Sequence, residues 1–164
     1  FIDPAGKQAN EELANLQHDR GKTREAEETY RQSLAMYRRT VAADSPYLAV
    51  ILNGLGRTLL ETGRPGEAEP LLRESLRIAG ASLADDHWLI LTSRSLLGAF
   101  LGATGRHPEG EPLVVRSYEG FSTTLGESDP RTRAALDRVV DFYRTWGRTD
   151  QARIWRAKQP AGRD

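Results

Sequence analysis

Three histidines are the residues of this chain best suited to acid–base chemistry near neutral pH. His18, His87 and His107 lie far apart in the sequence, and no serine or cysteine nucleophile motif accompanies them. A nucleophile, a base and an orienting group must all be present for triad-type catalysis. We therefore expect solvated or helix-capping histidines, and the sequence predicts no catalytic residue and no enzymatic activity.

Two short motifs have the residue types of binding sites. Asp85-Asp86-His87 could supply metal ligands, but adjacent carboxylates in front of a helix also act as N-cap acceptors. Gly54-Leu55-Gly56 follows no predicted strand and lacks the third glycine of a dinucleotide-binding loop. We therefore predict no metal site and no cofactor.

The overall charge and hydropathy exclude further classes of partner. Among 164 residues, 23 are Lys or Arg and 23 are Asp or Glu, so no net field favours nucleic acid or anionic lipid. The longest apolar run, residues 88–103, is interrupted by Arg94, whereas a membrane span needs about 20 mostly apolar residues. Cysteine is absent and no signal peptide is visible, which favours a cytoplasmic location. Because the chain begins at Phe1, we expect it to be part of a longer protein.

One segment recurs along the chain at a fixed interval. Its best copy is Gly63-Arg64-Pro65-Gly66-Glu67-Ala68-Glu69, and its first glycine returns at positions 21, 63, 105 and 147, with the same spacing each time. A fixed period of this length is typical of stacked repeats. The sequence predicts one repeat domain, residues 1–158, built from repeats at about 5–42, 44–84, 86–126 and 128–158, with a tail at 159–164.

Each repeat is predicted to be a pair of antiparallel helices, because its apolar residues recur every three or four positions. In the first repeat we expect helices at about 5–20 and 23–41, with Leu13 and Leu16 facing inward. Asp85 or Asp86 is expected to cap the fifth helix. Pro70 and Pro112 fall inside predicted helices, so either the helices bend there or they begin later, near Glu67 and Glu109.

Residues near the helix ends suggest how the repeats pack. Trp88, Trp146 and Trp155 are expected to pack between repeats or to cover the last one, with ligand anchoring as the alternative. Arg156 replaces an apolar residue of the earlier repeats, as in a helix that turns a polar face to water. Gly98 and Gly102 suggest that two helices cross closely.

The pattern within a repeat resembles a known family. Leu55-Gly56, Leu59, Gly63, Ala68 and Leu72 resemble the tetratricopeptide repeat, whose common form is about 34 residues long. The repeat of this chain is longer than that form. Its extra length, together with Asp44-Ser45-Pro46 and Leu52-Asn53-Gly54-Leu55-Gly56, resembles the kinesin-light-chain subclass.

The resemblance implies a right-handed α-solenoid of four helix pairs, whose first helices form a concave wall that binds a peptide segment or a helix. Asn53 matches the asparagine that such proteins use to bond a ligand's backbone, although a solvated or cross-helix-bonded asparagine is equally compatible. For the charged positions, an ordinary solvated surface is the alternative. The candidate groove residues are Asn15, Asn53, Arg57, Ser95, Asp137 and Asp141.

The sequence therefore predicts a scaffold or adaptor that binds a protein or peptide. Its wall lacks the row of lysine, asparagine and arginine that clamps chaperone C-termini, and its mixed charges suit a peptide with cationic ends and an acidic centre. The alternative is a self-associating or regulatory arm of a larger signalling protein, such as a kinase or a regulatory ATPase.

Overall fold

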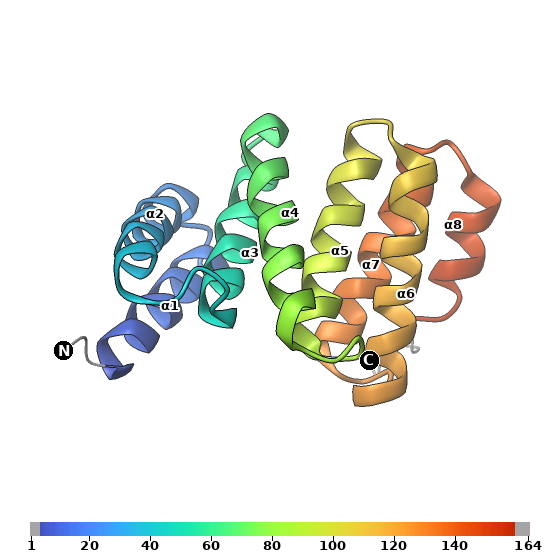
Figure 1. Cartoon of the computed structure of the whole chain (residues 1–164). Helices are drawn as coiled ribbons and strands as arrows, with labels where there is room; N and C mark the ends of the chain where they lie inside the picture. The colour runs from blue at the N-terminus through green and yellow to red at the C-terminus, as the bar shows by residue number, and fades with distance from the viewer. Residues whose placement is uncertain (1–3, 160–164) are drawn as a thin grey trace. The chain divides into compact units, whose positions relative to one another are not determined.

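A computed structural model describes residues 4–159 of the chain, with side chains from Glu12 to Gln159 (Figure 1). Every regular element in this part of the chain is an α-helix, and the all-α repeat fold expected from the sequence is confirmed. The helices are α1 (Pro4–Asp19), α2 (Thr23–Thr40), α3 (Pro46–Glu61), α4 (Pro65–Ser82), α5 (Trp88–Ala103), α6 (His107–Leu125), α7 (Pro130–Thr145) and α8 (Thr149–Arg156).

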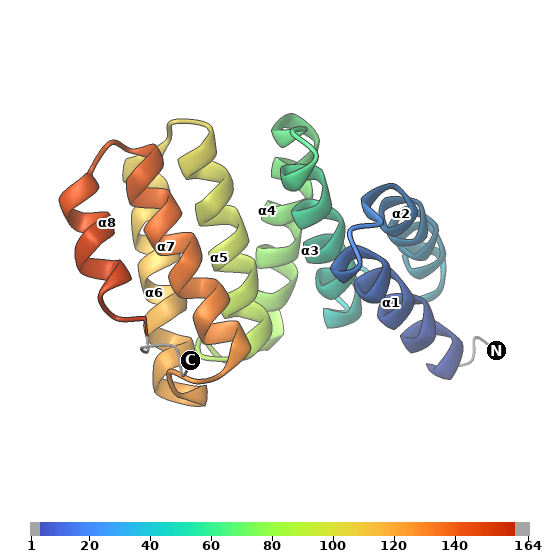
Figure 2. The ribbon, with the colours of Figure 1, turned by 180° about the vertical axis from the view of Figure 1, so that it is seen from behind.

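The chain divides into two compact units, residues 1–83 and 84–164. Unit 1 contains the helix pairs α1–α2 and α3–α4, and unit 2 contains α5–α6 and α7–α8. Within unit 1 the first helices of the two pairs, α1 and α3, contact each other, as do α5 and α7 within unit 2 (Figures 1 and 2). Each unit therefore has a face made of first helices. A single domain spanning residues 1–158 stays a prediction.

The recurring glycines end the first helix of each pair. Gly21, Gly63, Gly105 and Gly147 have φ values of 73°, 74°, 78° and 74°, a conformation that is strained for residues with a side chain. The residue after each glycine donates its N–H to a carbonyl five positions earlier, as Lys22 does to Gln17 at 2.8 Å. This is the Schellman arrangement, which satisfies carbonyls that the helix leaves free. The constant spacing of these glycines thus marks one repeated turn.

Helix starts agree only partly with the predicted caps. His87, not Asp85 or Asp86, caps α5, because its Nδ1 accepts the N–H of Leu89 at 3.2 Å. The expectation of a capping histidine is therefore confirmed at His87. Asp129 caps α7 and accepts the N–H of Arg131 at 2.8 Å.

The two internal prolines lie inside α4 and α6. The later helix start proposed from the sequence is wrong, because α4 begins at Pro65 and α6 at His107. The helical hydrogen bonds begin N-terminal to each proline. The carbonyls of Arg64 and Arg106 already accept N–H groups from the first turns of α4 and α6.

Close contacts join the helices of the α3–α4 and α5–α6 pairs. A Cβ placed on Gly98 of α5 would lie 3.0 Å from the backbone oxygen of Gly110 in α6, so the two backbones are in contact there. A serine on each of two second helices reinforces the pairing: Ser75 donates to the carbonyl of Ala49 at 2.9 Å, and Ser117 donates to that of Leu91 at 2.7 Å. The close crossing suggested by Gly98 is therefore confirmed.

Two expected core positions are exposed. Leu13 and Leu16 of α1 are 46% and 47% exposed, against the inward placement predicted from the sequence. Their equivalents in the fourth repeat, Val139 and Phe142 of α7, are 0% and 2% exposed. The difference arises because α7 packs against a preceding helix pair in its own unit, whereas no helix pair precedes α1 in the described chain.

Two of the tryptophans pack within unit 2. The ring of Trp146 stacks on His107 with centroids 5.0 Å apart. The ring of Trp155 in α8 makes an edge contact with Tyr118 and stacks on Tyr143. Both side chains therefore cover the junction of α6, α7 and α8, as expected. Trp88 differs, because 42% of its surface is exposed.

An ion-pair network joins the two second helices of unit 1. Glu27 of α2 bonds both Arg31 and Arg64, and Arg31 also reaches Glu67 of α4 at 2.8 Å. Partial burial acts to raise the pKa of the Glu27 carboxyl, but the hydrogen bonds from Arg31 and Arg64 outweigh it and hold this pKa below its usual value of 4.5. The network is a small, pH-dependent contribution to the docking of the two pairs.

We predict that Glu27→Gln reduces the loss of stability at acidic pH. A lowered folded-state pKa contributes stability above about pH 4.5, and this contribution is lost as pH falls through the folded-state value. The wild type should therefore lose about 1 kcal/mol more than the variant between pH 6 and pH 3. Urea denaturation across this range measures the difference. Glu28→Gln is the matched control, since Glu28 is exposed and makes no ion pair with a described residue; equal acid sensitivity of Glu27→Gln and wild type would refute the prediction.

Candidate functional site

The first-helix face of unit 1 contains Asn15 of α1 and Asn53 of α3. Tyr30 of α2 contacts both helices: its hydroxyl donates to Asn15 Oδ1 at 2.6 Å, and its ring occupies the space beside Gly54. Asn15 is partly exposed, whereas only 5% of Asn53 is exposed. A ligand on this face would thus meet little of Asn53 and more of Asn15.

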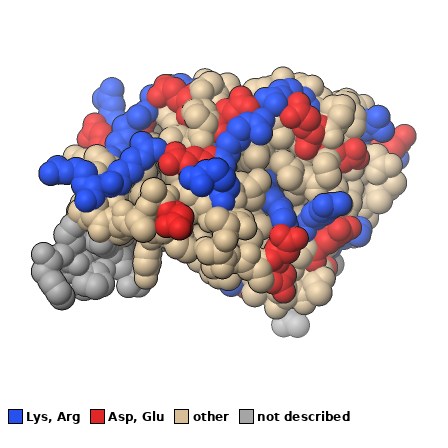
Figure 3. Space-filling view, in the orientation of Figure 1, with Lys and Arg blue, Asp and Glu red and all other residues tan. Residues whose placement is uncertain are grey.

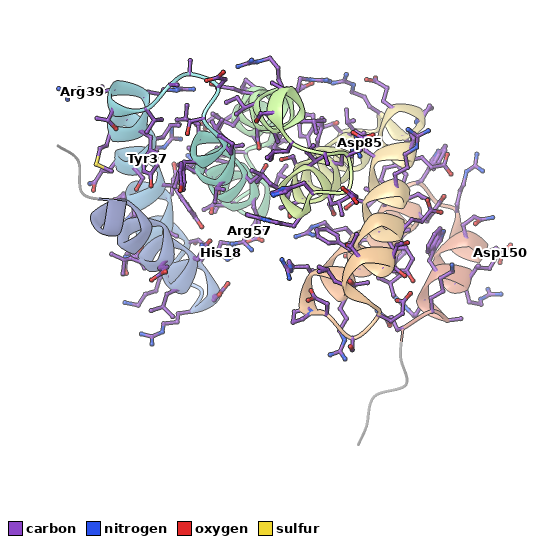
Figure 4. All side chains as sticks on the ribbon, turned by 60° about the horizontal axis from the view of Figure 1, so that its bottom comes forward. His18, Tyr37, Arg39, Arg57, Asp85 and Asp150 are labelled. Atoms are coloured by element: carbon purple, nitrogen blue, oxygen red, sulfur yellow. The ribbon has the colours of Figure 1, made fainter. Side chains whose placement is uncertain are left out.

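Arg57 lies one turn beyond Asn53 on the same helix and is half-buried (Figure 4). Its guanidinium makes no ion pair or hydrogen bond with the side chains described from Glu12 to Gln159. Its five N–H donors are therefore not used by these side chains, which suits a carboxylate or backbone carbonyl of a ligand.

A second polar contact flanks Arg57. His18 of α1 bonds Glu61 of α3, with 2.6 Å between Nε2 and Oε2, and its Nδ1 lies 3.6 Å from Asp19. These acidic partners fix the imidazole between α1 and α3. The contact is structural, and the sequence did not predict it.

The first-helix face of unit 2 is built differently. Ser95 of α5 is fully buried, with 0% exposure, and receives a hydrogen bond of 3.3 Å from Arg138 of α7. A ligand could therefore meet Arg138 rather than Ser95. The sequence reasoning missed Arg138, because it lies one position after the expected groove residue Asp137.

Two acidic side chains of α7 lie on the exposed side of this face. Asp137 accepts a hydrogen bond of 2.7 Å from Gln159, and Asp141 pairs with Arg144 at 2.9 Å. The side chains of Asp141 and Arg144 are 64% and 60% exposed, so this pair is weak and can be exchanged for a ligand's cation. Unit 2 thus presents carboxylates where unit 1 presents Arg57.

The acidic residues and histidines of the described part of the chain form no candidate metal site. They contain no group of three or more His, Asp or Glu side chains close enough to hold a metal ion. The histidines are separated by their structural roles, since His18 bonds Glu61, His87 caps α5 and His107 stacks on Trp146. No helix in the described part of the chain is long and apolar enough to span a membrane.

Acidic and basic side chains are interspersed over most of the face seen in Figure 3. In unit 1 this face includes the second helices α2 and α4, whose arginines and glutamates pair with one another: Arg31 with Glu67 at 2.8 Å and Arg38 with Glu74 at 2.7 Å. Such paired charges leave little net field for a phosphate backbone to bind.

Comparison with known proteins finds a family match in the first half of the chain. Residues 8–81 match the family model of the tetratricopeptide repeat. No curated protein sequence matches the chain.

Solved structures share the fold along nearly the whole chain. A putative kinesin light chain of Podosopora anserina with nearly identical TPR-like repeats aligns at a TM-score of 0.78 and 23% identity, covering 94% of this chain and 74% of that one. BtubC (BKLC) of P. vanneervenii aligns at a TM-score of 0.69 and 21% identity, covering 90% of this chain and 58% of that one. The resemblance to kinesin-light-chain-type tetratricopeptide repeats drawn from the sequence is thus confirmed at the level of fold.

Proposed function

Since residues 8–81 are tetratricopeptide repeats and the later residues continue the same helix pairs, we propose that the chain binds a peptide segment or helix on its first-helix faces. Proteins with such repeats are generally protein-interaction modules. The observation that favours these faces is the half-buried Arg57, whose donors make no contact with described side chains.

The two faces suit different ligand chemistry. On unit 1, Arg57 and Asn15 offer donors and an amide, which match a carboxylate and a peptide backbone. On unit 2, Asp137 and Asp141 offer carboxylates, which match lysine or arginine. A rigid helix face loses little conformational entropy on binding, so a few such contacts can give useful affinity.

We predict that Arg57→Ala weakens the binding of peptides selected on the intact chain by about 1–2 kcal/mol. Peptides would be selected from a displayed random library and measured by isothermal titration calorimetry. Arg24→Ala is the control, because Arg24 is an exposed arginine of α2 and lies outside the first-helix face.

Unit 2 is tested in the same way with Asp137→Asn and Asp141→Asn, and Glu119→Gln on the second helix α6 is the control. If neither Arg57→Ala nor the Asp variants change the affinity of any selected peptide, the first-helix faces are not the binding site. Peptides that bind equally well after reversal of all their charges would also contradict the role of these ionic groups.

A further inference from the structure

A small pocket lies where the end of α7 meets α8 in unit 2. Its volume is about 290 Å³, and it is lined by Arg144, Thr149, Ala152, Arg153 and Arg156. Asp150, which is labelled in Figure 4, shows the position of α8. A space of this size fits one large side chain rather than a drug-sized molecule.

The preceding helix pair shows what such a pocket accepts. The equivalent residues one repeat earlier include Gly102, His107 and Gly110, and they surround Phe142 of α7. A Cβ on Gly102 would lie 2.5 Å from Phe142, a Cβ on Gly110 would lie 2.7 Å from it, and the ring of His107 is 5.5 Å from its ring. The α5–α6 pair therefore docks the next helix by enclosing one aromatic side chain.

The polar contact beside that aromatic residue is also informative. Tyr143, the next residue of α7, donates its hydroxyl to Glu111 of α6 at 2.6 Å. The equivalent of Glu111 in α8 is Arg153, which can only donate hydrogen bonds. A helix that docked on α7–α8 would therefore need an acceptor where α7 has the tyrosine hydroxyl.

Two further exchanges make the pocket cationic. Arg144 replaces Gly102 and Arg156 replaces Val114. Arg153 and Asp150 are 3.4 Å apart with side chains 80% and 85% exposed, and Arg156 makes no ion pair with a described residue. Because these charges are solvated and weakly held, an anionic partner can compete for them.

We propose that the α7–α8 pocket docks an acidic amphipathic helix of a partner protein. The partner helix inserts one large apolar side chain against Thr149 and Ala152, and its carboxylates accept hydrogen bonds from Arg144, Arg153 and Arg156. The pocket borders the first-helix face of unit 2, where Arg144 pairs with Asp141, but it shares no residue with the first-helix face of unit 1.

A second copy of the chain is a poorer occupant. Its α1 would bring Leu16, which is equivalent to Phe142 and 47% exposed. In unit 1, Arg64 pairs with Glu27 of the preceding repeat. Lys22 is equivalent to Arg64, and Arg153 is equivalent to Glu27, so a docked second copy would bring Lys22 against Arg153. The like charges disfavour self-docking and favour a partner with carboxylates at this place.

The test uses a helix-stabilised, fluorescein-labelled peptide with the sequence of α7, Pro130–Thr145, in which all four arginines and Tyr143 are changed to Glu. A second peptide has Lys at the same positions. Fluorescence anisotropy should show binding of the acidic peptide only, with affinity falling as salt is added. Binding of both peptides with equal affinity would overturn the proposal.

Variants of the intact chain locate the site. The double variant Arg153→Glu/Arg156→Glu should weaken the acidic peptide about tenfold or more, while Arg116→Glu on the exposed side of α6 should leave it unchanged. Circular dichroism checks that both variants fold. Arg57→Ala should also leave the affinity unchanged, which separates this site from the first-helix face of unit 1. Wild-type affinity in the double variant, or self-association of the chain that the double variant abolishes, would overturn the proposal.

Discussion

Gly98→Val is expected to destabilise unit 2 by about 3 kcal/mol. A Cβ at position 98 would lie 2.6 Å from Val114 Cγ1 and 3.0 Å from both the Gly110 oxygen and the Val114 nitrogen. Two of these three atoms belong to the backbone of α6, so the clash cannot be relieved by rotating a side chain. The two helices must separate, which removes packing along the whole crossing.

Urea denaturation followed by circular dichroism measures this effect, and the midpoint should fall with little change in slope. Gly80→Ala is the matched control, because Gly80 is also inside a helix but has nothing within 4 Å of its would-be Cβ. That substitution should stabilise the chain by up to about 1 kcal/mol through helix propensity. A Gly98→Val midpoint equal to the wild-type value would show that the crossing is not tight.

The constant period of the sequence allowed the helix pairs and their turns to be predicted, because each copy of the motif must make the same local structure. Gly21, Gly63, Gly105 and Gly147 all adopt positive φ, as a residue that ends a helix without a Cβ penalty should. Ala26 and Ala68 are fully buried at equivalent places for the same reason. Local rules were sufficient here, since the backbone conformation at these positions does not depend on the neighbouring repeat.

Properties that depend on neighbours could not be predicted from the period. Leu13 and Leu16 have the same register as Val139 and Phe142, yet they are exposed because α1 lacks a preceding helix pair in the described chain. The cap of α5 shows a similar limit. Three consecutive residues there could all accept a hydrogen bond, and only the backbone geometry selects His87 over the two aspartates.

The candidate site was predicted only in part. The period places Asn53, Ser95 and Asp137 at one register position, but Asn53 and Ser95 are 5% and 0% exposed while Asp137 is exposed. Ser95 lies on α5, which contacts α7, and it receives a hydrogen bond from Arg138 of α7, whereas Asp137 lies on the last first helix of the described chain. The pocket at α8 was missed as well, because Arg156 by itself indicates only a solvated helix face. A role of any of these residues in peptide binding stays a prediction.

Phe142→Ala is expected to cost about 3–5 kcal/mol, the largest effect of any single change predicted for this chain. Phe142 is 2% exposed, and its ring contacts the rings of His107, Tyr143 and Trp146 as well as α5 and α6. Its loss removes the side chain by which α7 docks on the preceding pair. Urea denaturation should show unit 2 unfolding at a much lower concentration, and a loss below about 1 kcal/mol would contradict this role.

A second substitution distinguishes specific docking from general core loss. All three heavy atoms nearest to a Cβ at Gly102 belong to the Phe142 ring, at 2.5, 2.9 and 3.5 Å. Gly102→Ala should therefore destabilise the wild type by about 1–2 kcal/mol but stabilise Phe142→Ala, where the ring is gone and helix propensity decides. The double-mutant cycle should thus give a coupling energy of about 2 kcal/mol. Gly120→Ala, whose Cβ would meet Leu91 instead, should combine additively with Phe142→Ala. If the effects of Gly102→Ala and Phe142→Ala on stability were additive, Phe142 would be merely buried and would not hold α7 against α5 and α6.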